Sequence, residues 1–163
     1  MNSEIDLKLG VEDRELCTAC GGICCKRNPG VALPQDYGAH PRTIANKLIT
    51  GRWIVDWWEG DPTDGKLEPG QIAYFLRPAI KGFIDKLRYA GWGGECTFLT
   101  DEGCELELKD RPAECRWLVP ADKIEDCLMI KKVGKRNAAI EWLKCGDALE
   151  RAIDLARRMS NER

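Results

Sequence analysis

The chain lacks several features that would assign it to a common class. Its 163 residues include one histidine, His40, and no run of about 18 apolar residues, so we expect no membrane-spanning helix. The acidic amino-terminal stretch 1–6 has no apolar segment and therefore does not resemble a signal peptide. We accordingly expect the protein to be cytoplasmic and to have no membrane partner.

An excess of basic residues is also missing. Lysine and arginine total 25 against 27 aspartate and glutamate residues, for a formal net charge of −2. A nucleic-acid-binding domain normally carries a basic patch, so this balance argues against a nucleic-acid partner. The chain also has no G-x-G-x-x-G loop after a predicted strand and no nucleophile–histidine arrangement, and so gives no direct sign of catalysis.

Cysteine, in contrast, is abundant, with nine residues. Disulfides are rare in a reducing cytoplasm, and an odd count leaves at least one thiol unpaired in any intrachain scheme. The cysteines therefore indicate metal binding or redox activity rather than a disulfide framework.

The first cysteine group spans Cys17–Cys25 and reads Cys-Thr-Ala-Cys-Gly-Gly-Ile-Cys-Cys. Because Gly21-Gly22 interrupts helix and strand alike, we predict a tight knuckle that turns several sulfurs toward one point. A C-x2-C pair places two thiolates at adjacent corners of a site, about 2.3 Å from a zinc ion. The adjacent Cys24 and Cys25 either share one centre across a bent peptide, or one of them binds and the other packs as a small apolar residue.

A second cysteine group lies far along the chain, and we predict that it converges on the first. Seven thiols are too many for one tetrahedral zinc ion and one too few for two all-cysteine zinc sites, unless Cys127 joins them. A single iron–sulfur cluster would need four and leave three. The metal, zinc or iron–sulfur, and the number of centres stay open at this point. The candidate ligands are Cys17, Cys20, Cys24, Cys25, Cys96, Cys104 and Cys115.

The last of these cysteines sits in a helix-start pattern. Asp110 is expected to cap a short helix with Pro112 in its first turn, which places Cys115 about one turn in. The flanking Arg111 and Arg116 either offset the negative charge of a thiolate cluster or form surface ion pairs with nearby carboxylates.

These motifs together resemble a known family. Cys17-x2-Cys20-x3-Cys24-Cys25 is followed by Cys96-Thr-Phe-Leu, Gly103-Cys104 and Arg111-Pro112-x2-Cys115-Arg116. The order is similar to that of the YkgJ-type cysteine-cluster family, which is described as a zinc- or iron-chelating domain. The family pattern, CxxCxxCC, has two residues before the double cysteine where this chain has three. The resemblance implies metal binding through the seven cysteines and implies no particular activity.

For the fold, we expect one α+β domain over residues 1–163. It should contain a short antiparallel sheet, peripheral helices and irregular loops around a cysteine-ligated metal centre. The β-rich runs 52–58 and 71–77, separated by a turn-rich connection, predict a hairpin with a long loop. The cysteine core is assigned to residues 17–120 and the carboxy-terminal helices to 137–160.

Several helices follow from apolar spacing and terminal signals. Ile80, Phe83, Ile84 and Leu87 recur at helical spacing and predict a helix that ends at Gly91. Further helices are expected after Pro34, over 43–50 and over 137–144. The last helix should start at Asp147, whose pairing with Glu150 predicts a capping box. Its apolar stripe is expected to consist of Leu149, Ile153, Ala156 and Met159. His40 is interpreted as a surface or capping residue rather than a metal ligand.

Two classes of function follow from these patterns. The first is a cytoplasmic protein whose cysteine-bound zinc or iron–sulfur centre is mainly structural and supports binding to a protein partner. The alternative is a redox or protein-modifying enzyme that uses the cysteine-bound centre in its chemistry. A zinc-stapled nucleic-acid module is disfavoured by the acidic balance.

Overall fold

A computed structural model describes residues 13–66, 68–83, 86–91, 93–119, 128–129 and 133–162. The possible eighth ligand, Cys127, lies outside the described residues. The described part of the chain has the expected α+β composition, with helices and three two-stranded antiparallel sheets. Within it, no helix combines the length and apolar character needed to cross a membrane.

The predicted hairpin is confirmed. Strand β1 (Trp53–Glu59) pairs antiparallel with β2 (Ile72–Pro78), in a register that sets Trp53 opposite Pro78. Both strands are rich in β-branched and aromatic residues, which favour the pleated conformation. Their inward side chains form the centre of the hydrophobic core, in which Val55, Phe75 and Leu76 are fully buried.

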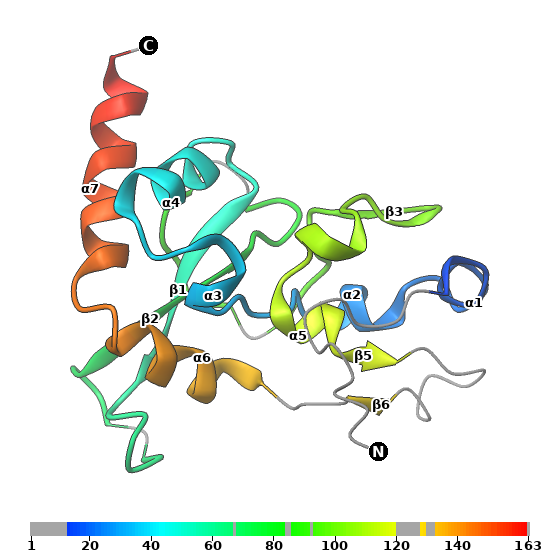
Figure 1. Cartoon of the computed structure of the whole chain (residues 1–163), viewed down its shortest axis with the longest axis horizontal. Helices are drawn as coiled ribbons and strands as arrows, with labels where there is room; N and C mark the ends of the chain where they lie inside the picture. Colours follow the sequence, from blue (N-terminus) through cyan, green and yellow to red (C-terminus); the bar gives the residue numbers. More distant parts are fainter. Residues whose placement is uncertain are drawn as a thin grey trace, which may run out of the picture.

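Three helices cover this hairpin, as Figure 1 shows. Helix α6 (Gly134–Leu143) packs on both strands, whereas α4 (Pro41–Leu48) and α7 (Ala148–Asn161) pack mainly on each other. Each helix turns an apolar stripe inward, and the stripe of α7 contains Leu149, Ile153 and Ala156, as the spacing predicts.

Two sequence predictions in this half are wrong. Asp147 precedes α7, but its side chain makes no capping hydrogen bond, so the capping box is not formed. No helix runs from Ile80 to Gly91 in the described residues. Instead, Ile80 pairs with Cys96 in a β-bridge and the backbone of Val55 bonds to that of Leu87. These backbone bonds to distant strands outweigh the local helical spacing, and Gly82, at φ +87°, breaks the run.

The other half of the molecule, at the right of Figure 1, carries the seven candidate cysteines and is built from short elements. Short helices and two-residue strands like these are not stable alone, so other interactions must hold them. The elements are α1 (Arg14–Ala19), α2 (Ile23–Arg27), β3 (Leu99–Thr100), β4 (Gly103–Cys104), the 3-10 turn η1 (Leu108–Asp110), α5 (Ala113–Arg116), β5 (Leu118–Val119) and β6 (Leu128–Met129). The short helix α3 (Pro34–Tyr37) lies between α2 and α4 in the chain and beside α4 and α6 in Figure 1.

Candidate metal centre

The first cysteine group lies on two short helices rather than in one irregular knuckle. Cys17 is in α1 and Cys20 is its carboxy-terminal cap, while Cys24 and Cys25 are in α2. The glycines between them have φ of +72° and +65°, a left-handed conformation that glycine adopts without strain. The prediction of a turn at this point is therefore correct, but the flanking cysteines are helical.

Gly22 also allows a close contact with the second cysteine group. A Cβ atom at this position would lie 2.6 Å from Cδ1 of Leu99. Asp13 caps α1 by accepting a hydrogen bond of 2.9 Å from the Leu16 amide. The Thr18 hydroxyl donates to the carbonyl of Glu102 at 3.2 Å, which fastens α1 to the β3–β4 hairpin.

Backbone hydrogen bonds join the two cysteine groups directly. The amide of Cys96 donates to the carbonyl of Cys25 at 2.8 Å, and the amide of Gly94 donates to the carbonyl of Arg27 at 2.9 Å. Because these bonds link backbone groups, they place the two segments side by side without using any cysteine side chain.

Cys115 is held against the loop that follows α2. The amide of Gly30 hydrogen-bonds to the sulfur of Cys115, and a Cβ atom on Gly30 would lie 2.4 Å from that sulfur. The next residue, Val31, donates its amide to the carboxylate of Glu114 at 2.7 Å. A glycine is therefore required at position 30 by the close approach of Cys115.

A carboxylate distant in sequence caps the helix that carries Cys115. Asp36 accepts hydrogen bonds of 2.8 Å from the amides of Leu33 and Ala113, and it forms a buried ion pair of 2.6 Å with Arg116. The prediction that Asp110 caps this helix is wrong. Asp110 ends η1, and its backbone carbonyl accepts a hydrogen bond from the Tyr37 hydroxyl. The short helix itself is confirmed.

All seven candidate ligands line one cavity of about 420 Å³. The cysteines that the structure describes are free thiols. Cys145 and His40 do not line this cavity. His40 instead caps α4 by accepting a hydrogen bond from the Arg42 amide. As the side chains stand, no three cysteine, histidine or acidic residues in the described part of the chain are grouped tightly enough to hold a metal ion.

The thiols of the cavity differ in their proton affinity. A hydrogen bond between the sulfurs of Cys24 and Cys25, which are 4.0 Å apart, lowers the pKa of Cys24 to about 6 and raises the pKa of Cys25. Burial raises the pKa of Cys96 to about 11, and burial also raises the pKa of Cys115. The exposed thiol of Cys24 therefore forms a thiolate more readily than those of Cys25, Cys96 and Cys115.

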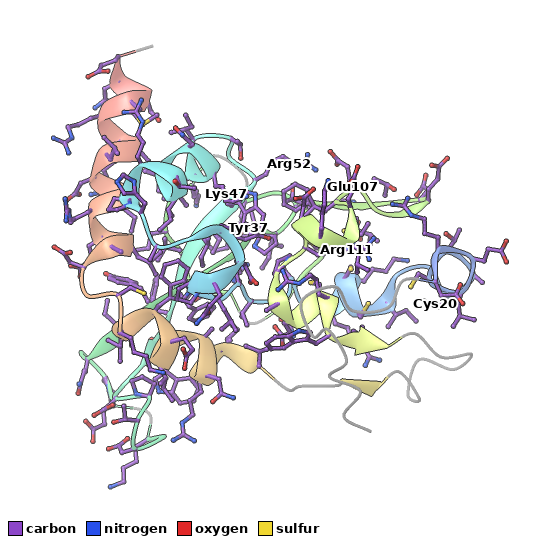
Figure 2. All side chains as sticks on the ribbon, in the orientation of Figure 1. Cys20, Tyr37, Lys47, Arg52, Glu107 and Arg111 are labelled. Atoms are coloured by element: carbon purple, nitrogen blue, oxygen red, sulfur yellow. The ribbon has the colours of Figure 1, made fainter. Side chains whose placement is uncertain are left out.

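Cations stand close to these thiols. Arg111 lines the cavity, bonds to the carbonyl of Leu106 at 3.0 Å and helps to lower the pKa of Cys24. Arg116 does not play this part, because it is paired with Asp36. Figure 2 places Cys20 and Arg111 in the half of the molecule away from α7.

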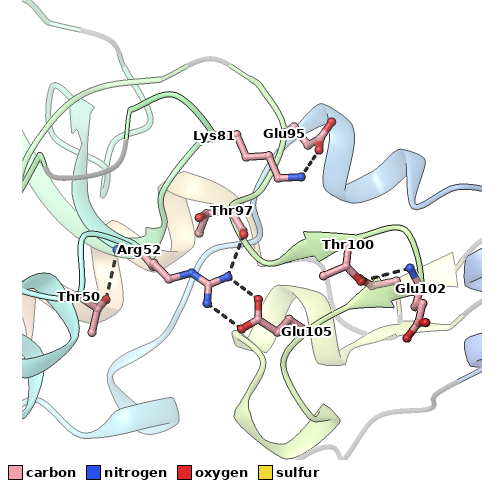
Figure 3. Close-up of polar contacts among 9 residues, drawn as sticks. Thr50, Arg52, Lys81, Glu95, Thr97, Thr100, Glu102 and Glu105 are labelled. Atoms are coloured by element: carbon pink, nitrogen blue, oxygen red, sulfur yellow. Dashed lines mark hydrogen bonds and ion pairs between the residues drawn. The ribbon is translucent and has the colours of Figure 1, made fainter.

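Arg52 is a further cation that the sequence did not single out. Its guanidinium group makes two hydrogen bonds to Glu105, at 2.6 and 2.8 Å, and one to the carbonyl of Thr97 at 3.0 Å (Figure 3). The bond to Glu105 is the largest cause of its raised pKa, and the charges of Cys96 and Cys104 contribute. Nothing in the local sequence indicates that an arginine just before a strand will lie within the electrostatic influence of these cysteines.

Comparisons with known proteins add no relative. No family model matches the chain, and neither the curated proteins nor the solved structures contain a match. The likeness to the cysteine-cluster family therefore depends on the motifs quoted from the sequence.

Proposed function

We propose that the protein is a cytoplasmic metal-binding protein that holds zinc or an iron–sulfur cluster through the thiols of the cavity. One observation carries the proposal: two cysteine groups from distant parts of the sequence line the same cavity. Cysteines that were merely apolar core residues would not be expected to gather around one space.

The donor set fits such a centre. Thiolates bind zinc and the iron of iron–sulfur clusters in preference to harder cations. The lining also contains the apolar side chains of Phe98, Leu99 and Leu106, which limit the access of water to bound metal. Arg27 and Arg111 in the lining supply positive charge that would offset the negative charge of a tetrathiolate centre.

The packing supports a structural role for the centre. Helices α1 and α2 are described in full, and neither has a fully buried residue, although Cys25 is half-buried against the hydrophobic core. Apolar burial therefore contributes little to their position, and helices of 6 and 5 residues are too short to be stable alone. Metal–thiolate bonds would supply the missing stabilisation and would present this half of the molecule to a protein partner as a fixed surface.

The alternative, a redox or protein-modifying enzyme, receives less support. Catalysis at the cavity would need a proton-transferring or cofactor-binding group besides the thiols. The single histidine, His40, is not part of the described lining. The lining carboxylates are Asp13, Glu102 and Glu114, and Asp13 and Glu114 accept hydrogen bonds from backbone amides that hold the local structure.

Elemental analysis of protein purified without oxygen, together with its visible spectrum, tests the proposal. We expect zinc or iron at one equivalent or more per chain, with broad visible absorption and acid-labile sulfide if the metal is iron. Protein that is folded and fully reduced, yet carries neither metal and takes up neither on reconstitution, would overturn the proposal.

A further inference from the structure

Arg52 joins the two chain segments that carry the candidate ligands Cys96 and Cys104. Both cysteines line the cavity, whereas Arg52 is not part of the described lining. We propose that Arg52 is a positioning residue of the metal centre, whose guanidinium group clamps the two segments together and so sets the spacing of the two thiols. This inference rests on the proposed function and adds to it a residue that acts on the centre without touching the metal.

The contacts of the guanidinium group fall directly beside the two cysteines. Its Nη2 donates to the carbonyl of Thr97, the residue after Cys96, at 3.0 Å. Its Nη1 and Nη2 donate to the two carboxylate oxygens of Glu105, the residue after Cys104, at 2.8 and 2.6 Å (Figure 3). The planar fork of an arginine matches a carboxylate in this two-bond arrangement, which fixes the orientation of both groups. One side chain therefore holds the flanks of both candidate ligands.

The backbone of Arg52 is anchored to the predicted hairpin. Arg52 immediately precedes β1, and its amide donates to the Thr50 hydroxyl at 3.2 Å. Its carbonyl accepts a hydrogen bond of 2.9 Å from the Ala79 amide, and the carbonyl of Ala79 accepts one of 3.0 Å from the Thr97 amide. These bonds use no cysteine side chain. The clamp thus extends from the half of the molecule that contains the hydrophobic core to the half that carries the candidate ligands.

The guanidinium group also stacks on the wall of the cavity. Its central carbon lies 4.1 Å from the centroid of the Phe98 ring, within the range of a cation–π contact. Phe98 is buried and lines the cavity, and its carbonyl accepts a hydrogen bond of 2.8 Å from the Glu105 amide. Arg52 therefore reaches the cavity wall through Phe98 as well as through the residues that follow the two cysteines.

The exposure of the clamp indicates which property it affects most. About a third of the Arg52 side chain and half of the Glu105 side chain are exposed, at 33% and 49%. An ion pair that is exposed to this degree contributes little to the stability of a fold. Loss of the groups that orient metal ligands, in contrast, typically lowers metal affinity about 10- to 100-fold. We therefore expect substitution of Arg52 to weaken metal binding more than it weakens the fold.

Arg52→Lys tests the assignment, because lysine keeps the positive charge but lacks the planar fork. The metal-loaded full chain is challenged with a chromophoric chelator of zinc or iron, and the metal released is measured against chelator concentration. We expect Arg52→Lys to release its metal at a chelator concentration about tenfold lower than the unaltered chain requires. Arg157→Lys, the matched control, makes the same change in an exposed ion pair of α7 and should release its metal as the unaltered chain does.

Two further measurements separate positioning from charge and from stability. A double variant with Arg52→Lys and Glu105→Gln should release its metal at the same chelator concentration as Arg52→Lys alone, because the clamp is already lost in the single variant. The metal-free chains of Arg52→Lys and Arg157→Lys should unfold at the same urea concentration.

Three results would overturn the assignment of Arg52 as a positioning residue. They are full metal retention by Arg52→Lys, a loss in the double variant equal to the sum of the two single losses, and a lower urea midpoint for metal-free Arg52→Lys than for metal-free Arg157→Lys. The last result would show a purely structural role. If the unaltered chain carries neither zinc nor iron and cannot be reconstituted, the proposed function itself fails, and this inference fails with it.

Discussion

The backbone amide of Cys96 donates a hydrogen bond of 2.8 Å to the backbone carbonyl of Cys25. This bond joins the two cysteine groups beside the cavity that both residues line. Because it uses backbone atoms, it leaves both thiols available to bind a metal. The predictions below follow from this arrangement of short elements around a shared cavity.

Removal of a cavity thiol should cost both metal and stability. For Cys104→Ser we expect the loss of one metal equivalent and a fall of several kcal/mol in the free energy of unfolding, because a structural site contributes on the order of 10 kcal/mol. Elemental analysis and urea denaturation measure the two effects. Cys145→Ser is the control, since Cys145 is half-buried but does not line the cavity. Equal losses in both variants would contradict the ligand assignment.

Metal removal should affect the two halves of the molecule differently. Chelation under reducing conditions should increase hydrogen exchange at the amides of residues 17–27, because no side chain of α1 or α2 is fully buried. The amides of β1 and β2 should stay protected, since their strands lie in the hydrophobic core. Mass spectrometry of the exchanged peptides separates these regions. A uniform increase across the chain would show that the centre supports the whole fold instead.

Gly30→Ala should weaken metal binding through a steric effect. Its Cβ atom would lie 2.4 Å from the sulfur of Cys115, so that cysteine or the loop must move, at a cost of about 1–3 kcal/mol. Competition with a chromophoric chelator measures the loss in affinity. Gly70→Ala is the control for metal affinity, because it strains the backbone at a φ of +88° but has nothing within 4 Å of the added Cβ atom and is not part of the lining. Unchanged affinity in Gly30→Ala would mean that Cys115 is not held there when metal is bound.

Asp36→Asn should destabilise the helix that carries Cys115. The substitution breaks a buried ion pair with Arg116 and weakens the cap on Ala113, and breaking a buried pair typically costs about 3–5 kcal/mol. Glu105→Gln removes the partner of Arg52 in a more exposed pair and should cost less than about 1 kcal/mol. Thermal and chemical denaturation of the two variants compares them. A larger loss in Glu105→Gln would contradict this account of how α5 is held.

Local sequence patterns predicted the helices and strands correctly where the interactions that decide the structure are themselves local. Strand composition located β1 and β2 to within one residue at each end, and apolar spacing identified the buried stripe of α7. Local spacing failed between Ile80 and Leu87, where β-bridges to distant backbone replaced the expected helix. The same cause explains the cap of α5, since a carboxylate from α3 took the place of Asp110.

The sequence by itself determined which chemistry the protein can offer: clustered thiols, a glycine pair that turns the chain between them, and almost no histidine. Side-chain type and short-range spacing are written directly in the chain, so these features needed no structure. Only the tertiary structure decided that the thiols line one cavity and that Asp36 holds the helix of Cys115. Such contacts join residues far apart in sequence, and their partners are selected by the packing of the whole chain rather than by any local pattern.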